Sequence, residues 1–281
     1  LGLTHELSNS TELILDGGLR TKDQDSFIKD NTGGGFNQTI DTELTTWSLT
    51  PRANLEWLLI GQDHQSVVGV DLYYADYDSD RSRNRNEAPV HRYLAHQTTF
   101  GFYGQDDFKL SDALTAQVGG RFIWNKFAGG DEFNPNAPGA NGFVGKRETT
   151  GAVDGYYLYN IGLEYEMTGN LAVFGRTGRS IRLPTIDERI GSSDGSTFKL
   201  KTQISRDVEV GLRYQTKKLT LQGSAFVMKL RNELRFDPTL GGGFGLNENS
   251  APTRRIGSEM AAGYEVTNNL KLQLNVAFID A

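Results

Sequence analysis

The chain has 281 residues, a length within reach of a single large β-barrel. Its 35 acidic side chains outnumber its 29 basic ones, which argues against a nucleic-acid partner held by bulk positive charge. Cysteine is absent, so a disulfide framework and thiolate metal sites are excluded, and an oxidising compartment is compatible. No apolar run reaches the length of about 18 residues that a membrane helix needs.

Segments in which apolar and polar residues alternate recur along the chain, and each predicts a β-strand with one apolar and one wet face. The clearest are residues 114–124, 157–167, 207–214 and 270–278. In the last of these, leucine, valine and phenylalanine alternate with lysine, glutamine, asparagine and alanine. Helical spacing fits these segments poorly.

Two kinds of connection alternate strictly along the chain. The short ones, a few polar residues each, predict hairpin turns near Ser8, Asp63, Asp112, Gly169, Lys217 and Asn268. The long ones lie at about 21–42, 79–92, 128–150, 181–200 and 232–253. In an up-and-down meander this order places all short turns at one end of the sheet and all long loops at the other.

This asymmetry, with alternating runs of roughly 9–14 residues, is typical of bacterial outer-membrane barrels rather than soluble sandwiches, whose strands are shorter. We therefore predict an all-β fold, a transmembrane antiparallel up-and-down β-barrel with about twelve strands present. A large soluble sandwich with a dry core remains the alternative. Aromatic residues near the long-loop ends predict a girdle at the membrane interface: Trp47, Tyr74, Tyr77, Tyr103, Trp124, Tyr156 and Tyr157. The alternative is that aromatic residues simply favour strands.

Motifs for catalysis or metal binding are not found in the sequence. There are four histidines, and His91 and His96 would face opposite sides of a strand, so they could not share a metal. The sequence has neither a phosphate-binding loop nor a serine nucleophile elbow. We expect no catalytic residue, no metal, no cofactor and no enzymatic activity.

The run "DSDRSRNRNEAPVHR", residues 78–92, concentrates positive charge in a predicted long loop. Its candidate ligand-binding residues are Arg81, Arg83, Arg85, His91 and Arg92. The first three alternate, so an extended chain would place them on one side, where they could attract an anionic ligand such as a ferric chelate. The alternative is a solvated loop that binds lipopolysaccharide phosphates or nothing.

The segment "RTGRSIRLPTIDERIG", residues 176–191, interrupts the strand pattern. Pro184 cannot donate a ladder hydrogen bond, so the strand that begins near Leu171 is expected to end near Ser180. Asp187 and Glu188 can pair with Arg179, Arg182 or Arg189 at the base of the loop. We interpret the segment as a structural corner, with direct ligand contact as the second possibility.

The same segment resembles a motif of TonB-dependent outer-membrane receptors, and the matching residues are Arg179, Ser180, Ile181, Arg182, Leu183, Pro184, Thr185 and Glu188. Three further elements resemble the family in the family's order: Tyr103, Gln105, Asp106, Leu110 and Asp112; then Glu209, Gly211 and Arg213; then Asn249, Gly257 and Glu259. Together the four cover residues 95–281. The loop base that the motif marks comprises Arg179, Arg182, Pro184, Thr185 and Glu188.

The resemblance implies a fragment, residues 1–281, of a barrel of about 22 strands, with the plug domain and the C-terminal closing strands absent. Both ends look cut. It further implies energy-coupled uptake, across a Gram-negative outer membrane, of a scarce large ligand such as a ferric siderophore, haem or a cobalamin, with the ferric siderophore as the first choice. The partners would be that ligand, outer-membrane lipid or lipopolysaccharide, and the TonB energy-coupling complex acting through the plug, with no nucleic acid. A passive porin-like or adhesion barrel, or a soluble ligand-binding scaffold, are the alternatives.

Charged residues on the polar face of the strands are then expected to line the lumen, many of them in contact with the plug. The candidates are Asp71, Arg121, Glu164, Arg176, Glu209 and Arg213, together with Asp207 and Lys271.

Overall fold

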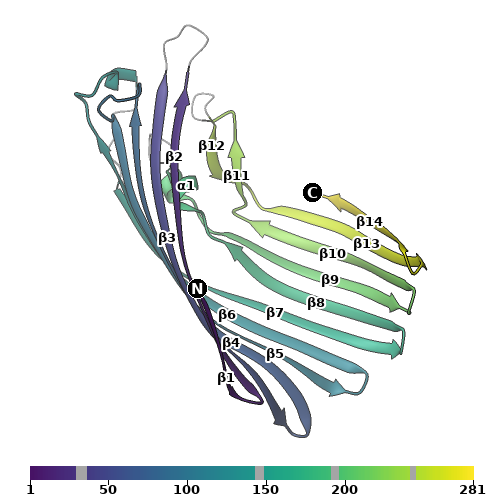
Figure 1. The fold of residues 1–281 in the computed structure, drawn as a ribbon. Coiled ribbons are helices and arrows are strands. Elements are labelled where there is room, and N and C mark those ends of the chain that lie inside the picture. The colour runs from purple at the N-terminus through teal and green to yellow at the C-terminus, as the bar shows by residue number, and fades with distance from the viewer. Residues whose placement is uncertain (30–36, 143–148, 191–195, 241–244) are drawn as a thin grey trace.

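Twelve strands form one antiparallel sheet in the computed structural model, which describes residues 1–29, 37–142, 149–190, 196–240 and 245–281. Each strand pairs with the next along the chain, except that β13 follows β10 (Figure 1). The strands are β1 (Gly2–Ser8), β2 (Thr11–Ile28), β3 (Gln38–Leu59), β4 (Gln62–Ser82), β5 (His91–Ser111), β6 (Leu114–Phe133), β7 (Thr149–Thr168), β8 (Leu171–Arg182), β9 (Gln203–Gln215), β10 (Leu219–Arg231), β13 (Thr253–Thr267) and β14 (Leu270–Asp280).

The smaller elements lie in the connections at one end of this sheet. They are the 3₁₀ turns η1 (Ala140–Gly142) and η2 (Ser196–Lys199), helix α1 (Ile186–Arg189) and a separate hairpin of β11 (Leu234–Asp237) and β12 (Leu246–Asn249). All the tight turns lie at the opposite end (Figure 1). The up-and-down topology and the count of about twelve strands are confirmed. The sheet is open, with β1 and β14 at its edges.

The strands at the long-connection end run further than the sequence predicted. β3 has 22 residues and β4 and β5 have 21 each, so the predicted loop at 79–92 shrinks to the stretch between Ser82 and His91. The predicted loop at 21–42 is largely strand as well, because β2 continues to Ile28 and β3 starts at Gln38. Polar residues fill both faces there, and the apolar alternation that marks a strand is lost.

The cross-strand register assigns every side chain to one of two faces, because directly opposite residues point to the same side of a sheet. We call the face that carries Tyr77, Ala95 and Phe127 the inner face, since helix α1 packs on it. The other is the outer face. Figure 1 shows the sheet curved around the side on which α1, β11 and β12 lie.

The outer face carries an exposed apolar band with aromatic residues at its two edges. On β3 the band runs from Trp47 to Trp57, which are 55% and 43% exposed. Ten residues at about 3.3 Å each span ~33 Å along the strand, and a tilt of about 40° reduces this to ~25 Å, the height of the apolar band of an outer-membrane barrel. Tyr74 lies directly opposite Trp47, and Trp124 and Tyr157 continue the upper edge.

The predicted girdle was only partly correct. Trp47, Tyr74, Trp124 and Tyr157 lie on the outer face, but the register places Tyr77, Tyr103 and Tyr156 on the inner face. Tyr77 packs under α1, and the Tyr103 ring lies 5.3 Å from the Arg121 guanidinium. A general preference of aromatics for strands accounts for these three.

No helix within the described ranges is long and apolar enough to cross a membrane.

A charge in the middle of the outer band should destabilise the barrel much more than a charge on the inner face. Val210, 58% exposed, lies halfway along the band on β9, and we expect Val210→Lys to lower the free energy of unfolding by about 2–4 kcal/mol. Ser224→Lys on the inner face of β10, diagonal to Val210, is the control, expected to cost less than about 1 kcal/mol. Urea titration of the full-length receptor in lipid vesicles measures both. Equal losses would contradict the assignment of faces.

Candidate functional site

The segment after β8 folds into a capped corner, residues 183–190. The β8 ladder ends at Arg182, and Pro184, which has no N–H to donate, is buried. Thr185 is the N-cap of α1, with extended backbone, and its hydroxyl accepts a hydrogen bond of 3.3 Å from the Glu188 N–H. The Glu188 carboxylate accepts one of 2.9 Å from the Thr185 N–H in return. This reciprocal capping box explains why a single helical turn begins here.

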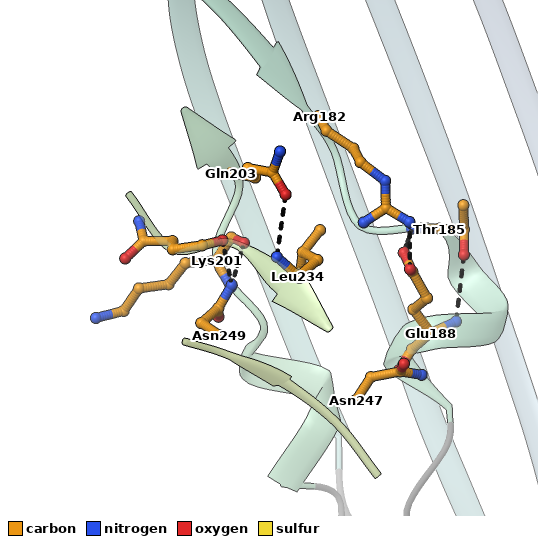
Figure 2. Close-up of polar contacts among 9 residues, drawn as sticks. Arg182, Thr185, Glu188, Lys201, Gln203, Leu234, Asn247 and Asn249 are labelled. Carbon is orange, nitrogen blue, oxygen red and sulfur yellow. Dashed lines mark hydrogen bonds and ion pairs between the residues drawn. The ribbon is translucent and has the colours of Figure 1, made fainter. Parts of the chain in front are cut away.

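Two ion pairs hold the corner to the sheet. The Glu188 carboxylate also accepts from the Arg182 guanidinium, and the Lys22 ammonium of β2 lies 3.3 Å from the Asp187 carboxylate (Figure 2 shows the first pair). The pairing predicted between these carboxylates and arginines thus occurs at Arg182. It does not occur at Arg179, which the register places on the outer face. The Lys22 contact could not be predicted, because 165 residues separate it from Asp187.

Apolar contacts fix the helix onto the inner face. Ile186, Ile190 and Phe198 pack against Tyr77, Tyr93, Ala95 and Phe127 in one buried cluster. Ile190 is fully buried and Phe127 is 1% exposed. The corner is therefore a small core inside the curve of the sheet, which confirms the structural part of its interpretation.

Arg189 is a buried cation within this core. Its guanidinium donates a 2.8 Å hydrogen bond to the Phe198 carbonyl and lies 4.7 Å from the centre of the Phe127 ring. Burial lowers the pKa of Arg189, while the nearby Asp154, Tyr156 and Glu188 oppose that shift. The ordinary pKa of arginine is so high that the group stays protonated at neutral pH.

A pocket of about 440 Å³ lies between the corner and the inner faces of β2 to β5. Its lining comprises Arg20, Lys22, Leu44, Thr46, Ala75, Gln97, Leu183, Pro184, Thr185, Ile186 and Asp187. Arg20 and Lys22 outweigh the single carboxylate of Asp187, so the pocket carries a net positive charge. Apolar walls with a few convergent polar groups are typical of small-molecule sites.

The hairpin β11–β12 is tied to the same region through asparagine side chains. The Asn249 amide donates 2.9 Å hydrogen bonds to the carbonyls of Lys201 and Asn232, and its oxygen accepts one of 2.7 Å from the Lys201 N–H (Figure 2). The Asn247 amide donates to the Glu188 carbonyl over 3.4 Å. The resemblance singled out Asn249 without a role, and the structure shows that it joins the base of the hairpin to the start of β9.

The predicted lumen-lining residues lie together on the inner face and pair across strands. Asp71 pairs with Arg121, and the Glu164 carboxylate lies 3.0 Å from the Arg213 guanidinium. Arg176 pairs with Glu209 and lies 3.8 Å from Asp207. Lys271 pairs with Glu265. All eight candidates therefore have partners within this chain, and contact with a plug remains a prediction.

The basic run at residues 78–92 does not form the shared cluster that was expected. Arg81 is in β4 on the inner face, where it donates to the Ile190 carbonyl over 3.3 Å. Arg83 donates to the Asn37 carbonyl over 3.5 Å, and Arg85 lies 3.6 Å from Asp25. Asp25 is on the outer face whereas Arg81 is on the inner face, so the three arginines do not share a side.

The last two members of that set are in β5 rather than in a loop. His91 is 1% exposed, and its Nδ1 lies 2.8 Å from the Asp131 carboxylate, so it is a buried member of a pair. Arg92 points to the outer face and pairs with Asp78. Among the described residues, no group of three or more histidines and carboxylates is arranged to hold a metal ion.

Comparison with known proteins identifies the fold and the family. A family model described as "TonB dependent receptor-like, beta-barrel" matches residues 1–281. The chain belongs to the TonB-dependent receptor β-barrel family. Barrels of this family are outer-membrane proteins, and the predicted resemblance and fold class are confirmed. No curated protein sequence matches the chain.

Solved structures of receptors and a transporter share the fold at low sequence identity. The ferric yersiniabactin uptake receptor FyuA from Yersinia pestis superposes with a TM-score of 0.71 at 15% identity over 99% of this chain and 41% of its own. The siderophore receptor PiuA from Acinetobacter baumannii gives 0.73 at 12%, over 99% and 45%. The copper transporter OprC gives 0.73 at 17%, over 99% and 45%. The chain thus spans less than half the length of these proteins.

Loss of the Glu188 carboxylate should loosen the corner. We expect Glu188→Ala to remove both the Arg182 pair and one half of the capping box, at a cost of about 1–2 kcal/mol in local opening free energy. Asp187→Ala is the control, since its exposed pair with Lys22 contributes only about 0–1 kcal/mol. Hydrogen exchange of the α1 amides in the full-length receptor reports both values. Unchanged protection in Glu188→Ala would show that packing alone holds the corner.

Proposed function

We propose that this chain is part of the barrel of a Gram-negative receptor for energy-coupled uptake of a scarce, large, anionic ligand, with a ferric siderophore as the best candidate. The plug domain and the remaining strands would then lie elsewhere in the same protein, in keeping with the 39–47% of the neighbouring structures that this chain spans. The observation that carries the proposal is the pocket on the inner face, inside a barrel whose family members are TonB-dependent receptors.

The charge of the pocket favours an anion. Arg20 has no carboxylate partner among the described residues. Nearer the short-turn end of the inner face, in contrast, acidic and basic side chains pair with each other across strands. A ferric chelate with negatively charged oxygens would gain charge-assisted hydrogen bonds from Arg20 and Lys22, and its apolar parts would contact Leu44, Leu183 and Ile186.

The neighbouring structures support a metal-linked ligand without deciding which one. Two are named for siderophore uptake and one for copper transport, at nearly the same TM-score. Since the same barrel serves different ligands, the choice depends on side chains in pockets and loops.

A passive porin-like or adhesion barrel is the competing function. Such a barrel would let solutes pass without coupling to the inner membrane. The soluble scaffold is disfavoured by the exposed apolar band on the outer face, which is far larger than the patches that monomeric soluble proteins expose.

Uptake by whole cells separates these possibilities. In cells that express the full-length receptor, we expect accumulation of radioactive iron from ferric chelates to stop when the energy-coupling complex is deleted. Arg20→Gln combined with Lys22→Gln should weaken chelate binding by about tenfold or more, equivalent to ~1.4 kcal/mol. The control is Lys217→Gln with Lys218→Gln, in the turn at the other end of the sheet. Uptake that persists without the complex would instead support a passive barrel.

A further inference from the structure

The outer face carries a row of four basic residues on four adjacent strands. Arg179 of β8 lies directly opposite Arg206 of β9, Arg206 opposite Lys229 of β10, and Lys229 opposite Arg254 of β13. Neighbouring strands are about 4.8 Å apart, so the row extends over ~15 Å. Arg231 lies two residues beyond Lys229 on the same face.

These charges are not neutralised within the sheet. The outer-face positions of β8, β9, β10 and β13 carry no acidic residue over the strand bounds given above. The nearest outer-face carboxylate of the sheet, Asp280 of β14, lies opposite Ile256 and is in none of the ion pairs of the described residues. Arg206, Lys229 and Arg254 are exposed, and the ion pairs of the described residues include none of them. Like charges directly opposite each other destabilise a sheet, so the row favours binding of an external anion.

Arg179 differs from the other three because it is anchored. Its guanidinium lies 3.9 Å from the centre of the Tyr157 ring and donates to the Tyr157 carbonyl, and the residue is only 8% exposed. Its Nε is buried and has no hydrogen-bond partner. The side chain thus sits at the aromatic edge of the apolar band, as cations at a membrane interface do.

The row lies at the headgroup level of a membrane. Tyr264, at the short-turn end of β13, is ten residues from Arg254, which corresponds to about 25 Å across the bilayer at the usual strand tilt. Between them the outer face is mostly apolar, with Ile256, Met260 and Ala262. The basic row therefore marks the long-connection edge of the band.

The other half of the barrel has the opposite charge at the same end. Between the apolar band and the long connections, the outer face of β2 to β6 carries eight acidic residues. They are Asp23, Asp25, Asp41, Glu43, Asp76, Asp78, Asp80 and Glu132. Arg85, Arg92 and Lys126 offset only part of this charge. An anionic headgroup is thus repelled by one sector and attracted by the other.

We propose that the outer face of β8, β9, β10 and β13 binds the headgroup of an outer-leaflet lipid that carries several phosphates, the chemistry of lipopolysaccharide. A simple glycerophospholipid offers one phosphate, whereas a row of ~15 Å suits a headgroup with phosphates at separate points. Acyl chains of the same lipid would lie on the apolar band below. Because the row faces away from the inner-face pocket, this site is independent of the transported ligand.

The test compares lipid binding by the full-length receptor and two charge-matched triple variants. Arg206→Gln/Lys229→Gln/Arg254→Gln removes the exposed part of the row and leaves the anchored Arg179. Lys109→Gln/Lys217→Gln/Lys218→Gln removes three exposed cations at the short-turn end. Native mass spectrometry of the detergent-solubilised protein, titrated with purified lipopolysaccharide, gives the apparent Kd. We expect a loss of about tenfold or more in the first variant only.

A second titration with dephosphorylated lipopolysaccharide identifies the recognised group. The unaltered receptor should bind it as weakly as the first triple variant does. Equal binding of the two lipids, or equal loss in the two variants, would overturn the proposal. Heat-modifiable gel mobility confirms that each variant has a folded barrel. If the first variant does not fold, the charge-keeping variant Arg206→Lys/Arg254→Lys is compared with single glutamine variants at Arg206, Lys229 and Arg254. Equal affinities of all these variants for lipopolysaccharide would again overturn the proposal.

Discussion

The structure depends on one constraint: each strand must present lipid-compatible side chains on one face and charged ones on the other. Alternation along a strand satisfies this constraint only in the correct pairing register, because a shift of one residue would exchange the side chains on the two faces. The cross-strand pairs on the inner face oppose such a slip. Asp16 with Arg52, Asp71 with Arg121, and Glu164 with Arg213 each join different strands, and a shifted register would leave their charges on the lipid side.

The strand pattern could be predicted from the sequence because the bilayer forces the period of two. Where the strands extend beyond the apolar band, neither face contacts lipid, so the alternation of apolar and polar residues is no longer required and is lost. The segments around Thr42 and Ser79 are strand, yet polar residues occupy both of their faces, so they were predicted to be loops. The same effect misplaced Arg81, His91 and Arg92, which the structure assigns to strands.

The candidate site was predictable only in its local part. Thr185 and Glu188 have the spacing of a capping box, a signal present in the sequence that would have indicated α1. The pocket, in contrast, joins β2 to a corner more than 160 residues later, and the ion pair of Lys22 with Asp187 follows from the curvature of the sheet. Asn249 likewise acts through three backbone groups that are distant in sequence.

Charged residues are arranged differently on the two faces of the sheet, since the inner face borders a hydrated interior and the outer face borders the membrane. On the inner face, many opposite charges on different strands pair with each other, and the pocket lined by Arg20 and Lys22 is locally positive. On the outer face, the charges are distributed by sector instead. Beyond the apolar band, acids predominate on β2 to β6 and bases on β8, β9, β10 and β13. Charges sorted in this way cannot satisfy each other across the sheet, so the outer surface has to find its counter-charges in the membrane that surrounds it.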